Sequence, residues 1–456
     1  MKYRSTRGGV SGLSFVEAVM MGLADDGGLL VPDSIPNVSE EMASWADASY
    51  GELATAIMSR YIDDIPHEVL SELVRTAYAS FDHPDVTPVV QVGDVHVLEL
   101  FHGPTLAFKD VALQFLGAVF EWVLERDAKA INIVGATSGD TGSAAIAGVR
   151  GKRNINIFIM FPEGRTSPTQ ELQMTTVSDA NVHNIGVEGS FDDCQSILKE
   201  TFSDIEFKRA HSLAAVNSVN WTRVLAQVVY YFFAWYRIGQ PAQFEVCVPT
   251  GNFGNIFAGY IARQMGLPIS RFILATNEND ILHRFFSTGV YSRGEVKQTH
   301  SPAMDIQVSS NLERYLYFLM GCSGENVRQF MAQFVNEGHA EIPMNTRILD
   351  DCFHSGAADN EATLKTIRDV YDETGYVLDP HTAVAMHVAS SHRGDGPLLV
   401  LSTAHPAKFS EAIGLAGVPV VGHPSLDQLS ELPTRKQVIP ADVDTLKQTI
   451  VQLSAH

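Results

Sequence analysis

The sequence contains few cysteines, and their spacing matches no metal or disulfide motif. There are four, and none belongs to a C-x-x-C pair. They are Cys194, Cys247, Cys322 and Cys352. Isolated thiols of this kind form neither a zinc site nor a disulfide framework. We therefore expect reduced cysteines, as in a cytoplasmic protein, and no bound metal.

Basic residues are also scarce. Lys and Arg number 32 against 53 Asp and Glu, which gives a net charge of −21. A surface of this sign repels nucleic acid and anionic membranes, so we predict neither as a partner. An anionic substrate would need a locally positive pocket that outweighs the negative electrostatic field of the whole protein.

Long hydrophobic runs are absent. The most apolar stretch, residues 224–236, is interrupted by Gln227 and is too short to span a bilayer. It predicts a buried helix. The polar residues 1–8 contain no signal-peptide core, which also favours the cytoplasm.

Glycine is plentiful, at 35 of 456 residues, and the chain is too long for one ordinary core. Ser14 followed by Glu17 predicts a capped helix over residues 14–23, and residues 39–81 read as further helices. Later segments alternate between predicted strands and predicted helices. We expect strands at 95–100, 131–136, 155–161, 244–248 and 397–402, and helices at 110–126, 144–149, from 256, 307–318 and 361–371. This alternation predicts parallel sheets covered by helices, an α/β fold.

Lys109 lies among apolar residues in the segment 101–110, whose sequence is FHGPTLAFKD. Apolar surroundings and a helix N-terminus both disfavour the ammonium form. A neutral amine is what Schiff-base chemistry requires. The alternative is a lysine whose stem packs on the core while its head reaches water.

Residues 248–255, with the sequence VPTGNFGN, join a strand to a helix. Two glycines allow a tight turn, and N–H groups converging at a helix N-terminus can bind a phosphate. No Walker lysine and no G-x-G-x-x-G pattern is present, which disfavours a nucleoside triphosphate. An ordinary glycine turn remains the alternative.

A second loop, residues 135–142, has the sequence GATSGDTG. Its hydroxyl and N–H groups could hold a carboxylate. Asp140 is unusual in a loop suited to anions. It could cap the following helix or orient a cofactor group.

Two further side chains are candidates. Thr403 follows a strand, where open α/β sheets bind ligands, and its hydroxyl could face a ring nitrogen; a simple strand-end turn is the alternative. Arg223 precedes the long apolar helix, and its guanidinium suits a phosphate or a carboxylate. It could equally pair with one of the many acidic residues.

The order of these motifs is more specific than any one of them. FKD at 108–110, SGDTG at 138–142, GNFGN at 251–255 and STAHPAKF at 402–409 resemble the threonine synthases, within the fold-type II group of pyridoxal-phosphate (PLP) enzymes. Shorter matches lie at 3–8, 22–29, 220–223, 301–305 and 309–311. The resemblance extends to about Phe409 and points to the longer class shared by enteric bacteria and fungi.

The resemblance implies a fold like that of the tryptophan synthase β subunit. We expect two α/β lobes with mainly parallel sheets, preceded by an N-terminal helical region. The predicted divisions are residues 1–92 for the N-terminal domain, 93–235 for the first α/β region, 236–420 for the second, and 421–456 for a polar tail. A monomer or weak dimer is expected.

The resemblance also implies a reaction and a set of roles. O-phospho-L-homoserine and water would give L-threonine and phosphate, with PLP on Lys109 and the pyridine nitrogen facing Thr403. The cofactor phosphate would be held by Gly251, Asn252, Phe253, Gly254 and Asn255. Predicted substrate contacts are Thr137, Ser138, Gly139, Thr141, Asn220 and Arg223. Asp140 would lie near the ring, with its role open, because two anions repel unless a proton is shared.

An alternative keeps the cofactor and changes the product. A threonine-synthase-like phospho-lyase would release 2-oxobutyrate, ammonia and phosphate from the same substrate.

Overall fold

The computed structural model describes residues 1–137, 139–215, 218–342 and 352–454, which form two compact units. Unit 1 contains residues 1–72, 81–102 and 218–421, and unit 2 contains residues 73–80, 103–217 and 422–456. This division does not follow the linear segments predicted from the sequence, because each unit is assembled from three separate stretches of chain. Of the predicted site residues, Ser138 lies outside the described part.

Unit 1 is built on a six-stranded sheet with the order β13-β10-β9-β14-β4-β3. Its pairings are parallel except that of β3 with β4. The strands are β3 (Val89–Val92), β4 (Val95–Glu99), β9 (Phe244–Pro249), β10 (Ile269–Thr276), β13 (Phe353–Ala357) and β14 (Leu398–Ser402). Every residue of β9 and β14 is buried, as expected for parallel strands covered on both faces.

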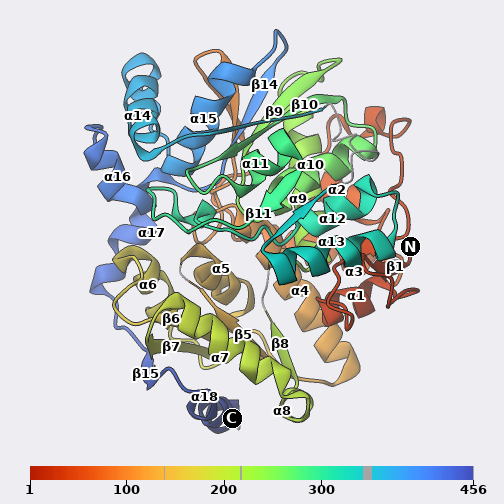
Figure 1. Cartoon of the computed structure of the whole chain (residues 1–456), viewed down its shortest axis with the longest axis vertical. Helices are drawn as coiled ribbons and strands as arrows, with labels where there is room; N and C mark the ends of the chain where they lie inside the picture. The colour runs from red at the N-terminus through yellow and green to blue at the C-terminus, as the bar shows by residue number, and fades with distance from the viewer. Residues whose placement is uncertain (138, 216–217, 343–351, 455–456) are drawn as a thin grey trace. The chain divides into compact units, whose positions relative to one another are not determined.

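Helices lie on both faces of this sheet (Figure 1). Ile273 of β10 shares a core with Val388 of α15 (Pro380–His392). The neighbouring Phe272 points the other way, toward Gly259 of α10 (Gly254–Gln264), where an added Cβ would lie 2.8 Å from the phenyl ring. Successive strand residues face opposite sides, so α15 and α10 cover opposite faces.

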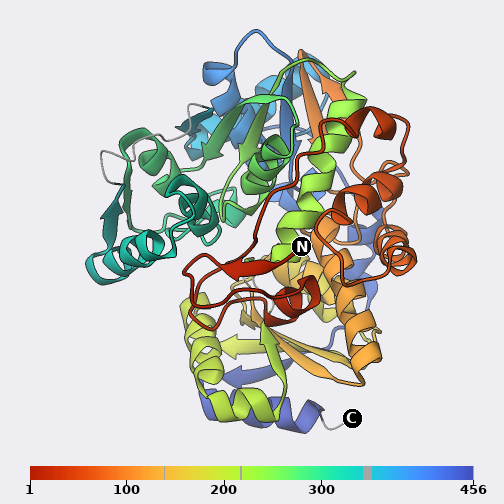
Figure 2. The ribbon, with the colours of Figure 1, turned by 90° about the vertical axis from the view of Figure 1, so that its right-hand side faces the viewer.

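The predicted buried helix is confirmed as α9 (Trp221–Arg237). The N-terminal segment packs along it, with the rings of Tyr3 and Tyr61 centred 6.2 and 5.9 Å from that of Trp221. Helices α1 (Phe15–Met21) and α2 (Tyr50–Met58) also contact α9 (Figure 2). The predicted capping box of Ser14 and Glu17 at α1 is present.

Unit 2 is built on a five-stranded parallel sheet with the order β15-β7-β6-β5-β8. The strands are β5 (Ile131–Ala136), β6 (Ile155–Pro162), β7 (Val182–Glu188), β8 (Leu213–Ala215) and β15 (Gln437–Pro440). Helices α7 (Phe191–Ser203) and α18 (Val443–Ser454) contact each other and share one core with the sheet (Figure 1).

The C-terminal tail is the main difference from the sequence expectations. It was predicted only as polar, yet it supplies edge strand β15 and helix α18 of unit 2. Leu446 and Ile450 of α18 are fully buried. A second difference is the helix predicted over 307–318, which begins only at Leu312 as α12 (Leu312–Leu319).

The remaining elements complete the two units. The helices are α3 (His67–Tyr78), α4 (Lys109–Asp127), α5 (Asp140–Val149), α6 (Pro168–Thr175), α8 (Ile205–Ala210), α11 (Ile281–Thr288), α13 (Gly324–Glu337), α14 (Asn360–Thr374), α16 (Ser410–Leu415) and α17 (Pro424–Asp427). Strands β1 (Tyr3–Ser5) and β2 (Leu30–Pro32) pair, as do β11 (Val290–Ser292) and β12 (His339–Glu341). Across the described ranges, no helix has the length and apolar character needed to cross a membrane.

Candidate active site

Lys109 is the first residue of α4, and the turn before it is fixed by its neighbour Asp110. The buried Asp110 carboxylate accepts hydrogen bonds from the backbone N–H of Thr105 at 2.8 Å and from its hydroxyl at 2.7 Å. Gly103 leaves room for this carboxylate, since an added Cβ would lie 2.6 Å from its oxygen. Asp110 therefore holds the loop that presents the lysine, a role the sequence did not indicate.

The Lys109 side chain is only 12% exposed. Its Nζ lies 5.7 Å from the centre of the Phe108 ring. The residue itself stands in the first turn of a 19-residue helix. Low exposure weighs against a lysine whose head reaches bulk water. Burial and the helix N-terminus disfavour the ammonium form, whereas the face of the Phe108 ring favours it.

Asp140 lies next to Lys109 within unit 2. One carboxylate oxygen is 3.9 Å from Lys109 Nζ, and the other accepts a hydrogen bond from Gln170 Nε2 at 2.9 Å. Asp140 does not cap α5, whose N-cap is Gly139. Gln170 is a site residue that sequence reasoning missed, because the 30-residue separation from Asp140 leaves no local signal.

The hydroxyl of Thr137 shapes the loop before α5. It donates to the Gly139 carbonyl at 2.8 Å and accepts from the N–H groups of Gly139 and Gly142, both at 3.1 Å. These bonds use its one donor and both acceptor positions. A substrate carboxylate would therefore meet the loop backbone, or the half-buried Thr141, before it met the Thr137 hydroxyl.

The predicted phosphate loop in unit 1 runs from β9 into α10. An added Cβ at Gly251 would lie 2.8 Å from the Ala303 carbonyl oxygen, so only glycine fits there. Phe253 adopts the left-handed conformation, with φ 61° and ψ 0°. Its ring is buried and stacks on that of Phe286 at 5.8 Å, which anchors the unusual backbone.

The loop presents donors that have no partner. Among the described residues, none of the N–H groups of residues 251–255 donates a hydrogen bond. The buried Nδ2 of Asn255 also lacks a partner in this part of the chain, whereas its Oδ1 accepts from Tyr230 and Tyr231. Unsatisfied buried donors are unfavourable, and an anion at a helix N-terminus would satisfy them. The loop therefore fits a phosphate group.

Thr403 lies at the same edge of the sheet as this loop. It directly follows β14, which pairs in parallel with β9, so the carboxyl ends of both strands meet. Thr403 is buried, and its hydroxyl makes no hydrogen bond to a residue that the structure describes. This contrasts with the alternative of a threonine satisfied by its own backbone, and it leaves the hydroxyl for a ligand.

Asn220 and Arg223 lie at the start of α9, Asn220 as its N-cap and Arg223 in its first turn. The Asn220 side chain accepts from the Thr222 N–H at 3.0 Å and donates to the Val19 carbonyl at 2.9 Å, so it caps the helix and ties it to α1. Arg223 is 5% exposed, and burial lowers its pKa to about 10. A buried guanidinium remains protonated at neutral pH and can attract an anion.

The predicted site residues thus fall in both units. Lys109, Thr137, Gly139, Asp140 and Thr141 belong to unit 2, and the phosphate loop, Thr403, Asn220 and Arg223 belong to unit 1. In unit 2 the structure brings Lys109 and Asp140 together. In unit 1 it places the phosphate loop and Thr403 at one sheet edge.

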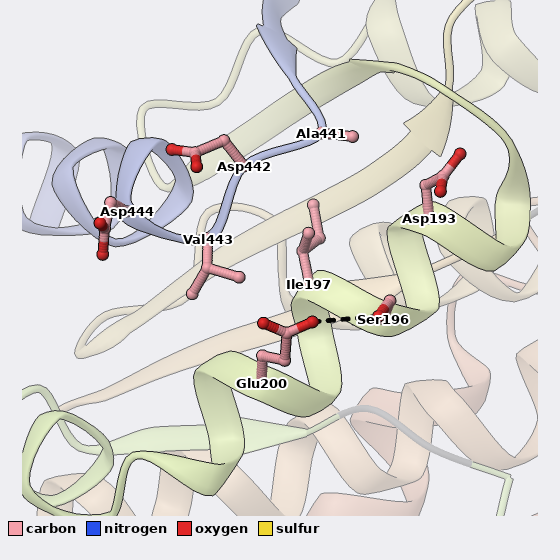
Figure 3. A pocket seen from close by; sticks show the side chains of 8 residues that line it. All are labelled: Asp193, Ser196, Ile197, Glu200, Ala441, Asp442, Val443 and Asp444. Atoms are coloured by element: carbon pink, nitrogen blue, oxygen red, sulfur yellow. Dashed lines mark hydrogen bonds between the residues drawn. The ribbon is translucent and has the colours of Figure 1, made fainter.

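A surface pocket in unit 2 contains none of these residues (Figure 3). Four of its lining side chains are acidic: Asp193, Glu200, Asp442 and Asp444. Asp193 and Asp442 accept hydrogen bonds at the starts of α7 and α18, which explains them structurally. The pocket is unsuited to an anionic substrate.

Comparison with known proteins gives matches along nearly the whole chain. The family "Threonine synthase N terminus" matches residues 2–78, "Pyridoxal-phosphate dependent enzyme" residues 82–403, and "Threonine synthase, C-terminal" residues 382–450. A threonine synthase of Eremothecium gossypii is 47% identical over 98% of this chain and 97% of its own length.

Solved structures that resemble this chain include threonine synthases. A PLP-bound threonine synthase from Brucella melitensis has a TM-score of 0.97 and 43% identity, and it covers all of both chains. The threonine synthase from yeast has a TM-score of 0.94, with 43% identity over 100% of this chain and 99% of that one. The predicted fold-type II α/β fold and the predicted cofactor are confirmed. The chain therefore belongs to the threonine synthase family of PLP-dependent enzymes.

Proposed function

We propose that this enzyme converts O-phospho-L-homoserine and water into L-threonine and phosphate, the last step of threonine biosynthesis, with Lys109 as the lysine that binds PLP. The observation that carries the proposal is the match to threonine synthases along nearly the whole chain. The motifs at Lys109, at residues 251–255 and at Thr403 in this sequence support it.

PLP supplies an electron-accepting ring that stabilises negative charge on the substrate carbon atoms. Lys109 would hold PLP through its aldehyde group, and as a free amine it would carry protons to and from Cα and Cβ of the substrate. The low exposure of its side chain limits contact with water. Asp140, 3.9 Å away, can share the proton that Lys109 takes up.

In unit 1 the residues have binding roles. The N–H groups of residues 251–255 and Asn255 Nδ2 would hold the cofactor phosphate, and the Thr403 hydroxyl would serve as the partner of the pyridine nitrogen. A neutral hydroxyl there does not force that nitrogen to be protonated. Arg223 holds the substrate phosphate, which leaves more easily when a cation stabilises the charge that develops on it.

The loop before α5 orients the substrate carboxylate through its backbone and Thr141. This contact fixes the Cα–H bond for cleavage, an effect of proximity. The Thr137 hydroxyl supports the loop from within.

Product analysis tests the proposal. The purified enzyme, given O-phospho-L-homoserine, should release threonine and phosphate in equal amounts. Release of 2-oxobutyrate and ammonia with the phosphate would identify the phospho-lyase instead. Lys109→Ala should abolish turnover while the fold remains intact. The matched control is Lys129→Ala, because the side chain of Lys129 is 71% exposed and should be dispensable.

A further inference from the structure

Three consecutive residues, 309–311, donate hydrogen bonds to the phosphate loop. Ser309 Oγ donates to the Gly251 carbonyl at 2.8 Å, and Ser310 Oγ donates to Asn252 Oδ1 at 3.0 Å. Asn311 donates twice to the Asn252 carbonyl, from its backbone N–H at 3.1 Å and from Nδ2 at 3.0 Å. These bonds explain why the helix predicted over 307–318 begins only after Asn311.

The bonds determine where the loop N–H groups point. In a trans peptide the carbonyl of one residue and the N–H of the next point in opposite directions. Holding the Gly251 carbonyl toward Ser309 therefore turns the Asn252 N–H away from Ser309. Holding the Asn252 carbonyl toward Asn311 turns the Phe253 N–H away in the same manner. Both of these N–H groups lack a partner among the described residues.

Arg314 fixes the orientation of the Asn311 amide. Its guanidinium is fully buried and donates to Asn311 Oδ1, to the Leu30 carbonyl at 3.0 Å and to the Val219 carbonyl. Because arginine has only donors, the Asn311 atom that faces it must be the oxygen. The Nδ2 group is then directed toward the carbonyls of Asn252 and Ser218, at 3.0 and 3.1 Å.

Arg314 keeps this role at physiological pH. Burial lowers its pKa to about 9, and the adjacent Glu313 acts in the opposite direction. The guanidinium is therefore mainly protonated near neutral pH. Its three acceptors come from three parts of unit 1, so the orientation of Asn311 is fixed from outside the loop.

We propose that Ser309, Ser310 and Asn311, with Asn311 locked by Arg314, are positioning residues that aim the N–H groups of Asn252 and Phe253 at the cofactor phosphate. Ser309 and Asn311 act through the loop backbone, and Ser310 acts through the Asn252 side chain. The inference rests on the proposed function, which assigns the cofactor phosphate to this loop.

A comparison of two ligands isolates the effect. PLP and pyridoxal share the aldehyde and the ring, and only PLP carries the phosphate. The ratio of their dissociation constants, measured on the full-length chain freed of cofactor, therefore reports the phosphate site alone. A general loosening of the protein would weaken both ligands and leave the ratio unchanged.

Ser309→Ala removes one donor with little change in volume. Losing a buried hydrogen bond of this kind should reduce the preference for PLP over pyridoxal about five- to tenfold. Thr363→Val is the matched control, since Thr363 is also buried in unit 1 and its hydroxyl donates to the Asp359 carbonyl at 2.7 Å. This control should keep the wild-type ratio.

A second variant, Asn311→Asp, keeps the contact with Arg314 but has no side-chain donor for the Asn252 carbonyl. It should lose at least as much preference as Ser309→Ala. An unchanged ratio in both loop variants would refute the positioning role, as would an equal loss in Thr363→Val. If the wild-type chain showed no preference for PLP over pyridoxal, the loop would not be the phosphate site, and the proposed function of the loop would fail. That outcome differs from an unchanged ratio in the loop variants and from a loss in the control.

Discussion

At the scale of single residues, the carboxylate of Asp140 acts on the charge state of Lys109. Asp140 lies 3.9 Å from Nζ and is itself held by Gln170. A negative charge at that distance favours the ammonium form, whereas burial and the helix N-terminus favour the neutral amine. Under the proposed function, the balance between them sets the pH at which Lys109 takes up the aldehyde of PLP.

Asp140→Asn should shift that balance toward the neutral amine. Two unit charges about 4 Å apart interact by roughly 1 to 4 kcal/mol at a protein surface, so the shift should be about one pH unit or more. The rate of PLP uptake by the cofactor-free chain, plotted against pH, should reach half its maximum at lower pH than in the wild type. A midpoint that stays in place or rises would show that the carboxylate does not act on Lys109.

The protonation of His183 on β7 makes the stability of the fold depend on pH. Its ring stacks on Phe158 with centroids 4.6 Å apart, and burial, aided by Arg435, lowers its pKa to about 4. The unfolded chain therefore binds more protons than the folded chain between about pH 6.5 and 4. The stability from a neutral His183 is complete above this window and is lost as the pH falls through it.

His183→Gln cannot take up a proton in this window. On going from about pH 7.5 to pH 5, the wild type should lose about 1–2 kcal/mol more stability than the variant. Thermal unfolding at the two pH values measures the difference. Equal losses in the two proteins would mean that His183 does not contribute to acid sensitivity.

At the scale of helices and strands, unit 2 depends on a close contact between α4 and α5. An added Cβ at Gly117 of α4 would lie 1.9 Å from the Gly148 carbonyl oxygen of α5. The two helices carry Lys109 and Asp140 at their first positions. Their separation therefore helps to set the distance between the two side chains.

Gly117→Ala should force these helices apart. Overpacking of this kind costs typically about 1–3 kcal/mol, and activity should fall with stability because the distance between Lys109 and Asp140 changes. Gly414→Ala is the control, since Gly414 lies in α16 with open space around it, and it should be neutral or slightly stabilising. Normal activity and thermal stability in Gly117→Ala would contradict this account.

The sequence predicts most elements whose signals are local. Ser14 and Glu17 mark the start of α1 because capping is a contact between near neighbours, and the apolar runs of β5, β6 and β9 identify buried strands. Strand β15 was missed because three of its four residues are exposed and its partner among the described strands, β7, is about 250 positions away. Gln170 escaped notice for the same reason, since Asp140 lies 30 positions away. Arg314 did too, because its contacts with the Leu30 and Val219 carbonyls join residues far apart in the chain.

At the scale of the molecule, the chain leaves unit 2 at residue 217 and returns to it at 422. The returning tail closes the core between α7 and the sheet with Ile439, Leu446 and Ile450. A chain truncated after Val421 should therefore retain a protease-resistant unit 1 and lose unit 2, and with it the activity. Limited proteolysis with mass analysis of the fragments would measure this. A truncated chain that is as resistant and as active as the full chain would show that the tail is dispensable.

Everything proposed about the chemistry depends on which lysine binds PLP. Borohydride reduction of the holoenzyme converts the imine into a stable amine, and peptide mass spectrometry then locates the added mass. We predict that it lies on Lys109 alone and that Lys109→Ala protein acquires no label. A label on another lysine, with Lys109 unmodified in fully active enzyme, would contradict the account.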